Sequence, residues 1–200
     1  MGNKRELLIP GGYYHLYNRA VAEEALFQQQ GDYGRFLDTY KKYIEPLADT
    51  YCYCLMPNHF HSLIKIKDEI DIIRRVNTDL NSEYVPKVLA NEFGKGFNSF
   101  AKYYNLKYKR KGSLFIHTFN RKPVNSLQYL NILVCYIHAN PYNAGLCQQL
   151  EDWKYSSYKH YFRDTSSKIN LKTQETLSWF DSKENFIFVH NDFIKSNPEG

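Results

Sequence analysis

The sequence lacks the features of a membrane-spanning or secreted protein. It contains no run of about 18 apolar residues, so we expect no membrane-spanning helix. Its first residues, MGNKRELLIPGG, include basic side chains but no apolar core, so we expect no signal peptide. Cysteine is scarce, and the C-x-C spacing of Cys52 and Cys54 suits neither a mutual disulfide nor the usual zinc site. We expect these two residues, Cys135 and Cys147 to be reduced and mostly buried, as in a cytoplasmic protein.

Internal repeats, low-complexity segments and a large excess of one charge sign are also missing. The 200 residues are 43% hydrophobic, which excludes a disordered chain and allows one domain with an appended tail. The 26 basic and 21 acidic residues give a net charge of +5, a weak indication of a polyanionic partner. The 18 tyrosines are more informative, because aromatic rings stack on nucleic-acid bases. Most of them are nevertheless expected to fill half-exposed positions in strands and helices.

Residue patterns predict strands and helices in an alternating order. Strands are predicted at residues 11–21, 49–56, 59–67 and 112–119. Helices are predicted at residues 31–45, 70–76, within 87–111 and at 126–140, and either a helix or a strand at 180–194. The order predicts an α+β fold, a ferredoxin-like or RRM-like sandwich with an antiparallel sheet.

The helix at residues 126–140 has the clearest pattern. Ser126 or Asn125 is expected to cap it, and Pro141 is expected to end it. Its expected apolar stripe consists of Leu127, Leu130, Leu133, Val134 and Ile137. The preceding residues, 121–125, are expected to form a turn.

Two histidines alternate with a phenylalanine at the start of a predicted strand. His59 and His61 are therefore expected on one face of the sheet, with Phe60 on the other. Tyr136 and Asn140, four residues apart, share one flank of their predicted helix. Two imidazoles and an amide oxygen would suit Mn²⁺ or Mg²⁺ and leave positions open for catalysis. The alternative is that the histidines are ordinary polar residues, Tyr136 an edge aromatic and Asn140 a residue at the helix end.

A basic and aromatic run, FAKYYNLKYKRKGSLF, occupies residues 100–115. This composition is typical of a surface that grips a nucleic-acid backbone and stacks bases. The candidate DNA-binding residues are Lys102, Lys107, Tyr108, Lys109, Arg110 and Lys111, together with Arg121. The alternative is a solvated helix end followed by a loop.

Two segments, CLMPNHFHSLIKI and YIHANPYNAGL, resemble motifs of the single-tyrosine HUH transposases. HUH denotes histidine, a bulky hydrophobe and histidine, here His59, Phe60 and His61. The second segment matches the helix that carries the family's catalytic tyrosine, at Tyr136. YYHLYNRAV, RKGSLF and WKYSSY also resemble family segments, so the resemblance covers roughly residues 11–162. It is strongest to the branch of REP-associated tyrosine transposases.

The resemblance implies an HUH nuclease fold, with a catalytic domain at residues 1–163 and a C-terminal extension of unknown role at residues 164–200. It implies that Tyr136 attacks single-stranded, hairpin-flanked DNA in an endonuclease and strand-transfer reaction, giving a 5′-phosphotyrosine intermediate. The implied cofactor is a divalent metal, Mg²⁺ or Mn²⁺. The implied metal ligands are His59, His61 and, as a candidate third, Asn140. Relatives act as dimers or alone, so a homodimer is possible.

Several alternatives stay open. The main one is a domesticated or inactive protein of the same fold that binds single-stranded nucleic acid without cutting it. A metallohydrolase would need the metal but not Tyr136, and an RRM-type RNA binder is disfavoured because no GFGFV-like strand occurs. Tyr129 and Tyr142 are competing nucleophiles. Of the other polar residues, His138 is expected to be structural or to contact DNA, and His15 and Asn18 to line the site.

Overall fold

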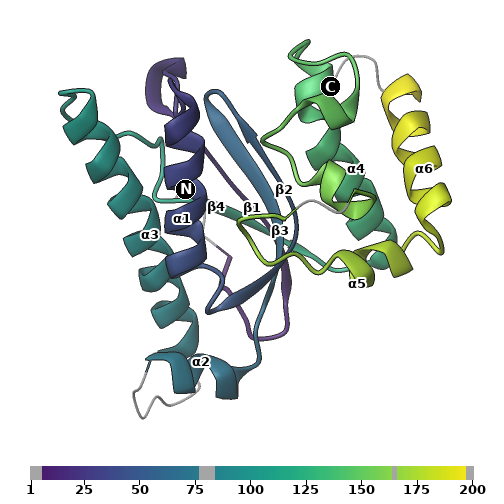
Figure 1. The fold of residues 1–200 in the computed structure, drawn as a ribbon. Coiled ribbons are helices and arrows are strands. Elements are labelled where there is room, and N and C mark those ends of the chain that lie inside the picture. The colour runs from purple at the N-terminus through teal and green to yellow at the C-terminus, as the bar shows by residue number, and fades with distance from the viewer. Residues whose placement is uncertain (1–5, 77–83, 164–165, 197–200) are drawn as a thin grey trace, which may run out of the picture.

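A computed structural model describes residues 6–76, 84–163 and 166–196 of the chain. Within these residues, four strands form one antiparallel sheet in the order β2-β3-β1-β4 (Figure 1). The strands are β1 (Tyr13–Arg19), β2 (Ala48–Met56), β3 (His59–Ile66) and β4 (Asn120–Val124). This topology confirms the predicted α+β sandwich with an antiparallel sheet.

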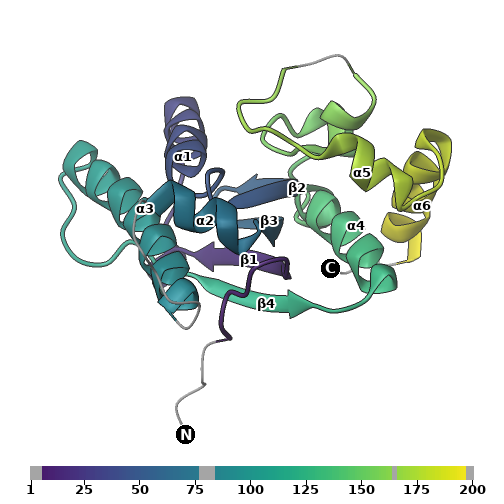
Figure 2. The same cartoon turned by 90° about the horizontal axis from the view of Figure 1, so that it is seen from below.

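Helices cover both faces of the sheet. One face carries α1 (Gln30–Tyr43) and α3 (Val85–Lys107), and the other carries α4 (Leu127–Asn143), as Figure 2 shows. The remaining helices are α2 (Glu69–Val76), α5 (Thr173–Ser178) and α6 (Lys183–Ser196). Of these, α6 packs on α4, on the side away from the sheet. No helix among the described residues is long and apolar enough to cross a membrane.

Each face of the sheet has its own apolar core. Phe60, Ile64 and Ile66 pack on the side of α1 and α3, whereas Cys54 and Leu63 pack on the side of α4. The alternation predicted along β3 is therefore confirmed, and it leaves His59 and His61 on the α4 side of the sheet. All four cysteines are free, and three of them are buried.

The last strand lies one segment later than the pattern predicted. Residues 112–119 form no strand, although Phe115 makes an isolated bridge to Ala20. The strand is instead β4, in the segment expected to be a turn. Pro123 suggested a turn because proline cannot donate to a ladder. It is tolerated here because β4 lies at the edge of the sheet.

The helix α4 follows its pattern except at its ends. The Ser126 hydroxyl caps it by accepting from the Tyr129 amide at 3.2 Å, as predicted. Leu127, which was expected in the apolar stripe, is instead 56% exposed in the first turn of the helix. Pro141 does not end the helix, which continues to Asn143. The Ala144 amide still donates to the Asn140 carbonyl at 3.0 Å, so helical hydrogen bonding continues beyond Pro141.

The C-terminal segment packs against the back of α4. Residues 180–194, for which helix and strand were both open, lie largely in α6. His138 Nδ1 lies 2.9 Å from His190 Nε2, and His138 Nε2 lies 2.8 Å from Ser157 Oγ. All three residues are fully buried, so His138 has a structural role. Residues 164–165, where the extension was expected to begin, lie outside the described residues, and the domain boundary at residue 163 stays a prediction.

Candidate active site

The two candidate metal-binding histidines follow the turn between β2 and β3. The Pro57 carbonyl accepts from the amides of Leu26 and Phe27, at 2.7 and 3.1 Å. The Asn58 carbonyl accepts from the Ala20 amide at 2.9 Å. The loop after β1 therefore holds the turn by its backbone, and the start of β3 is fixed on both sides.

Both imidazoles are hydrogen-bonded through the same ring atom. His59 Nδ1 lies 2.6 Å from Asn58 Oδ1, and His61 Nδ1 lies 2.8 Å from Nε2 of His15 on β1. In each ring the atom left for a ligand is Nε2. Metal-binding histidines are usually held in this way, with the second nitrogen bonded to a neighbouring group.

Burial keeps these imidazoles neutral at pH 7. It lowers the pKa of His59 and, more strongly, that of His61, and the charge of Arg19 acts in the same direction. Burial and the charge of Lys122 lower the pKa of His15 to about 4. A neutral imidazole has a free lone pair, which a metal ion requires of a histidine ligand.

Tyr136 lies over this histidine group from α4. Its ring centroid is 5.6 Å from that of His61 and 6.1 Å from that of His15, with edge-on geometry to both. The side chain is 37% exposed, so a substrate can reach its hydroxyl. Tyr136 is thus an α4 tyrosine whose ring contacts the histidines, whereas Tyr129, one heptad earlier on nearly the same flank, is 43% exposed.

Asn140 joins the group from the next turn of α4. Its Nδ2 donates to the Tyr136 carbonyl at 2.7 Å. A hydrogen bond between the side chains of Asn140 and His59 opposes the lowering of the His59 pKa. The helix therefore places an amide beside one imidazole and a phenol beside the other.

The donor set fits a divalent cation with mixed ligands. No three side chains drawn from His, Cys, Asp and Glu form a metal-binding cluster within the described parts of the chain. The available donors are the Nε2 atoms of His59 and His61 and the carbonyl oxygen of Asn140. Imidazole with amide oxygen suits Mn²⁺ and accommodates Mg²⁺, and three protein ligands leave positions open.

Asn18 does not line this site. It is buried on the opposite face of β1, where its Nδ2 donates to the carbonyls of His117 and Thr118 at 2.8 and 3.0 Å. It anchors the irregular segment before β4. His15, three residues earlier on the other face, does contact the histidine group.

The basic and aromatic run at the end of α3 divides into two kinds of residue. Lys107 pairs with Asp32 at 2.6 Å and Arg110 pairs with Glu24 at 2.5 Å, so both cations already have partners. The Tyr108 hydroxyl also donates to Asp32, at 2.6 Å. The exposed lysines of the run form no ion pair within the part of the chain that the structure describes. They are Lys102, Lys109 and Lys111.

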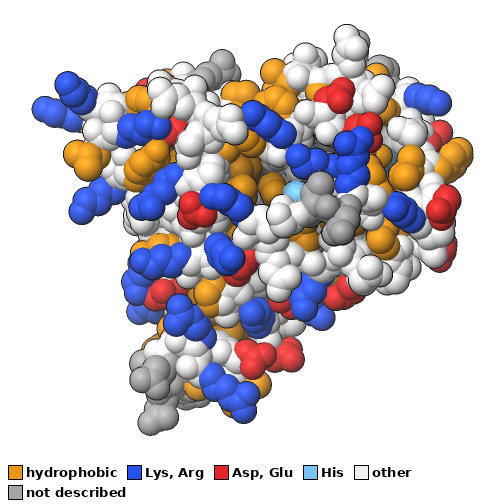
Figure 3. All heavy atoms as spheres, in the orientation of Figure 1, with side chains coloured by type: hydrophobic (Ala, Val, Ile, Leu, Met, Phe, Trp, Pro, Cys, Tyr) orange, Lys and Arg blue, Asp and Glu red, His pale blue; other side chains and the backbone are white. Residues whose placement is uncertain are grey.

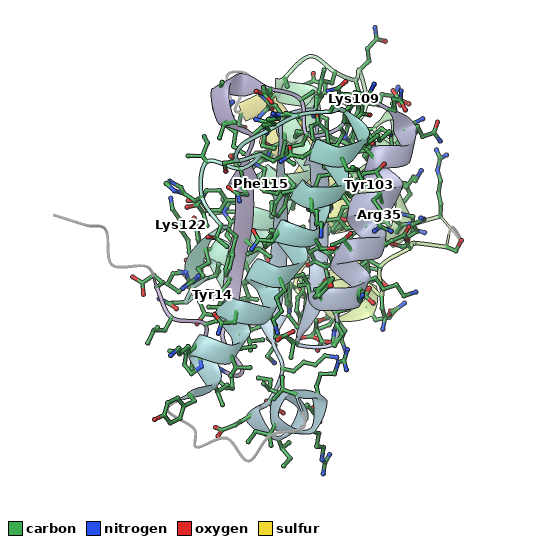
Figure 4. All side chains as sticks on the ribbon, turned by 90° about the vertical axis from the view of Figure 1, so that its left-hand side faces the viewer. Tyr14, Arg35, Tyr103, Lys109, Phe115 and Lys122 are labelled. Carbon is green, nitrogen blue, oxygen red and sulfur yellow. The ribbon has the colours of Figure 1, made fainter. Side chains whose placement is uncertain are left out.

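The sheet register separates Arg121 from the histidines. Arg121 pairs with Leu16, whose side chain lies on the α1 and α3 face, and its guanidinium carbon is 4.8 Å from the Phe119 ring centroid. Lys122, beside it, pairs with His15 and shares the face of the site. Figure 4 shows Lys122 at the edge of the sheet. Arg19 pairs with His59 in the same way, and both cations were missed because a sequence does not reveal which strands are neighbours.

Asp32 is the buried acceptor that organises the end of α3. Its carboxylate accepts hydrogen bonds from the backbone amides of Gln28 and Gln29, at 3.0 and 2.9 Å, and completes a capping box at the start of α1. It also accepts hydrogen bonds from the Tyr103 hydroxyl at 3.1 Å, the Lys107 ammonium and the Tyr108 hydroxyl. Figure 4 shows Tyr103 beside Arg35 of α1, with the guanidinium carbon 5.3 Å from the ring centroid. Half of the run therefore joins α3 to α1.

Replacing Asp32 with Asn should lower the free energy of unfolding by about 2–3 kcal/mol, because a buried charged acceptor and helix cap are lost. Burial raises the pKa of this carboxyl, but the hydrogen bonds from Lys107 and Tyr108 outweigh it, and the net pKa is below 3.8. The stabilisation is thus complete above the ordinary carboxyl pKa and is lost as pH falls through the lower folded-state value. Urea unfolding of both proteins at pH 7 and pH 3 tests this. A difference in stability that grows at pH 3 would contradict it.

No family model matches the chain. A curated relative from Haemophilus influenzae, which carries the name REP-associated tyrosine transposase, is 25% identical over 171 residues, covering 84% of this chain and 90% of the relative. A solved structure of a REP-associated tyrosine transposase bound to a REP hairpin has a TM-score of 0.58 and 14% sequence identity, and the match covers 86% of this chain and 96% of the other. These two matches confirm the resemblance of the chain to REP-associated tyrosine transposases.

Proposed function

We propose that the protein is a transposase-type endonuclease and strand transferase that acts on single-stranded DNA beside a hairpin. The oxygen of Tyr136 attacks a phosphodiester, so that an O–P bond to tyrosine forms and the bond to the 3′-oxygen breaks. The phenolic proton is lost and the 3′-oxygen leaves as a hydroxyl. The 5′ side stays on the protein as a phosphotyrosine, and strand transfer reverses the step.

The observation that carries this proposal is the position of Tyr136 over the histidine group. Its ring is 5.6 Å from that of His61, and its partly exposed hydroxyl can meet a phosphate held at the Nε2 side of the imidazoles. A water-using metallohydrolase would not need a tyrosine there. The relatives named as tyrosine transposases support the same reaction.

His59, His61 and Asn140 would hold a divalent metal, Mg²⁺ or Mn²⁺. Such an ion, when bound, polarises the scissile phosphate and offsets developing negative charge. The chain itself orients the nucleophile, because α4 carries Tyr136 and Asn140 on one flank. These residues come from one copy of the chain, so we propose that a monomer suffices for cleavage, and that it acts in the cytoplasm with its cysteines reduced.

The DNA backbone would be bound by cations from two places. Lys102, Lys109 and Lys111 lie at the exposed end of α3, and Figure 3 shows lysine and arginine side chains spread along α1 and α3. Arg19 and Lys122 flank the histidines and would contact phosphates next to the cleavage point. We give Arg121 no such role, since its side chain lies on the other face of the sheet.

Changing Lys102, Lys109 and Lys111 together to Gln should weaken hairpin binding and flatten its dependence on salt. Each lost phosphate contact reduces the steepness of log K against log salt by roughly 0.7–0.9, so a decrease of about 2–3 is expected for three lysines. The matched control removes three lysines away from α1 and α3, at Lys159, Lys183 and Lys195. Filter binding of a labelled hairpin at several salt concentrations measures both slopes. Equal slopes for the two triple variants would remove the end of α3 from the DNA interface.

An adduct assay tests the proposed reaction. The protein is mixed with labelled single-stranded DNA from the flanks of its own gene, with Mn²⁺, with Mg²⁺ or with a chelator. A metal-dependent band that migrates as a protein–DNA adduct on a denaturing gel is the expected result. Tight hairpin binding without an adduct would favour the alternative, a binding protein of the same fold.

A further inference from the structure

The bond between His15 and His61 differs from the bond that holds His59. Asn58 presents a carbonyl oxygen to His59 Nδ1, and an oxygen can only accept, so the proton must lie on Nδ1 of His59. His15 presents an imidazole nitrogen to His61 Nδ1, at 2.8 Å, and a neutral imidazole nitrogen can either donate or accept. The tautomer of His61 is therefore decided by His15.

Only one of the two arrangements leaves His61 able to bind a cation. If His61 Nδ1 donates, His15 Nε2 accepts and the lone pair of His61 is on Nε2. If His15 donates, the His61 proton lies on Nε2, and that atom no longer has a lone pair. A metal-binding His61 thus requires His15 to be the acceptor.

Burial and ring contacts fix the position of His15 behind His61. Its side chain is 7% exposed, and its ring meets that of His61 edge to edge, with centroids 5.0 Å apart and an angle of 27° between the rings. Tyr17, two residues along β1, packs against it with centroids 4.8 Å apart. His15 Nε2 points at His61 Nδ1 and not toward the side where His61 Nε2 is open. His15 therefore lies behind His61, away from the proposed cation.

We propose that His15 is a positioning residue that fixes the tautomer and ring orientation of His61, so that His61 Nε2 faces the cation. This inference rests on the proposed function, because it assumes that His59 and His61 hold a metal. It assigns His15 no contact with DNA or with the metal.

Two variants of similar side-chain length separate the hydrogen bond from His61 to residue 15 from the packing of that residue. His15→Gln retains a carbonyl oxygen that can accept from His61, whereas His15→Met has the same chain length without that acceptor. Mn²⁺ affinity without DNA is measured by the electron paramagnetic resonance signal of free Mn²⁺. His15→Met should lose affinity by about 10–100-fold, as expected when the group behind a ligand is removed. His15→Gln should stay close to the wild type.

The control is Tyr14→Phe, on the opposite face of the same strand. The Tyr14 hydroxyl accepts from the Ile9 amide and donates to the Leu7 carbonyl, so its loss should lower stability without altering Mn²⁺ affinity. Thermal unfolding without metal reports the folded state of each variant. Wild-type affinity in His15→Met would overturn the inference, and so would an equal loss in His15→Gln, which would make the imidazole itself necessary.

His61→Ala distinguishes this failure from failure of the proposed metal site. If His61→Ala loses Mn²⁺ and His15→Met does not, the metal site stands and only the positioning role is wrong. If His61→Ala binds Mn²⁺ as well as the wild type does, the metal site itself is wrong, and the role of His15 falls with it.

Discussion

Tyr136→Phe should form no covalent DNA adduct above background while binding a hairpin as tightly as the wild type. The change removes one oxygen, the nucleophile of the proposed reaction, and leaves the ring that contacts His15 and His61. Phenylalanine cannot form a phosphoester, so the expected loss is complete rather than partial. A denaturing gel with labelled single-stranded DNA measures the adduct, and a native gel measures binding.

Tyr129→Phe is the matched control, since it makes the same change one heptad earlier in α4, at a tyrosine that is 43% exposed. It should form the adduct at the wild-type rate. An adduct that survives Tyr136→Phe and disappears in Tyr129→Phe would move the nucleophile, and the site would have to be rebuilt around a different part of the helix.

The double change of His59 and His61 to Ala should abolish Mn²⁺ binding and slow adduct formation by at least about a thousandfold, since several kcal/mol of charge stabilisation are lost. Both side chains lie on the same face of β3, and the ring of His61 contacts that of Tyr136. Titration with Mn²⁺ and a single-turnover adduct assay measure the two effects separately.

His117→Ala, at an exposed histidine before β4, is the control for the histidine change. Hairpin binding should be retained in both variants. Thermal unfolding measures any stability that is lost with the buried His61 ring and its hydrogen bond to His15. If the double variant cleaves at the wild-type rate with unchanged dependence on Mn²⁺, the metal does not act through these residues.

The spacing of residues in the sequence was sufficient to predict those parts of the site that lie within a single strand or helix. Alternation along β3 separates His59 and His61 from Phe60, and the four-residue spacing on α4 brings Tyr136 and Asn140 to one flank. Both follow from the geometry of a single strand or helix, which does not depend on the rest of the fold. The ferredoxin-like order of elements was predictable for the same reason.

The contacts between elements could not be predicted in this way. Lys122 shares a face with His15, and Lys107 is committed to Asp32, 75 residues earlier in the chain. The edge position that allows Pro123 in a strand is also a property of the whole sheet. The sequence therefore predicted Lys107, Arg110 and Arg121 as DNA-binding residues. In the structure Lys107 and Arg110 form ion pairs, and Arg121 lies on the other face of the sheet.

The backbone hydrogen bonds that hold the β2–β3 turn allow its local opening to be measured by amide hydrogen exchange. The amides of Ala20, Leu26 and Phe27 all donate to carbonyls of Pro57 or Asn58, so they can exchange with deuterium only when the loop separates from the turn. Separation would also release the start of β3. The exchange rate of these amides thus reports how often the histidine strand loses its support, in a protein that carries neither DNA nor metal.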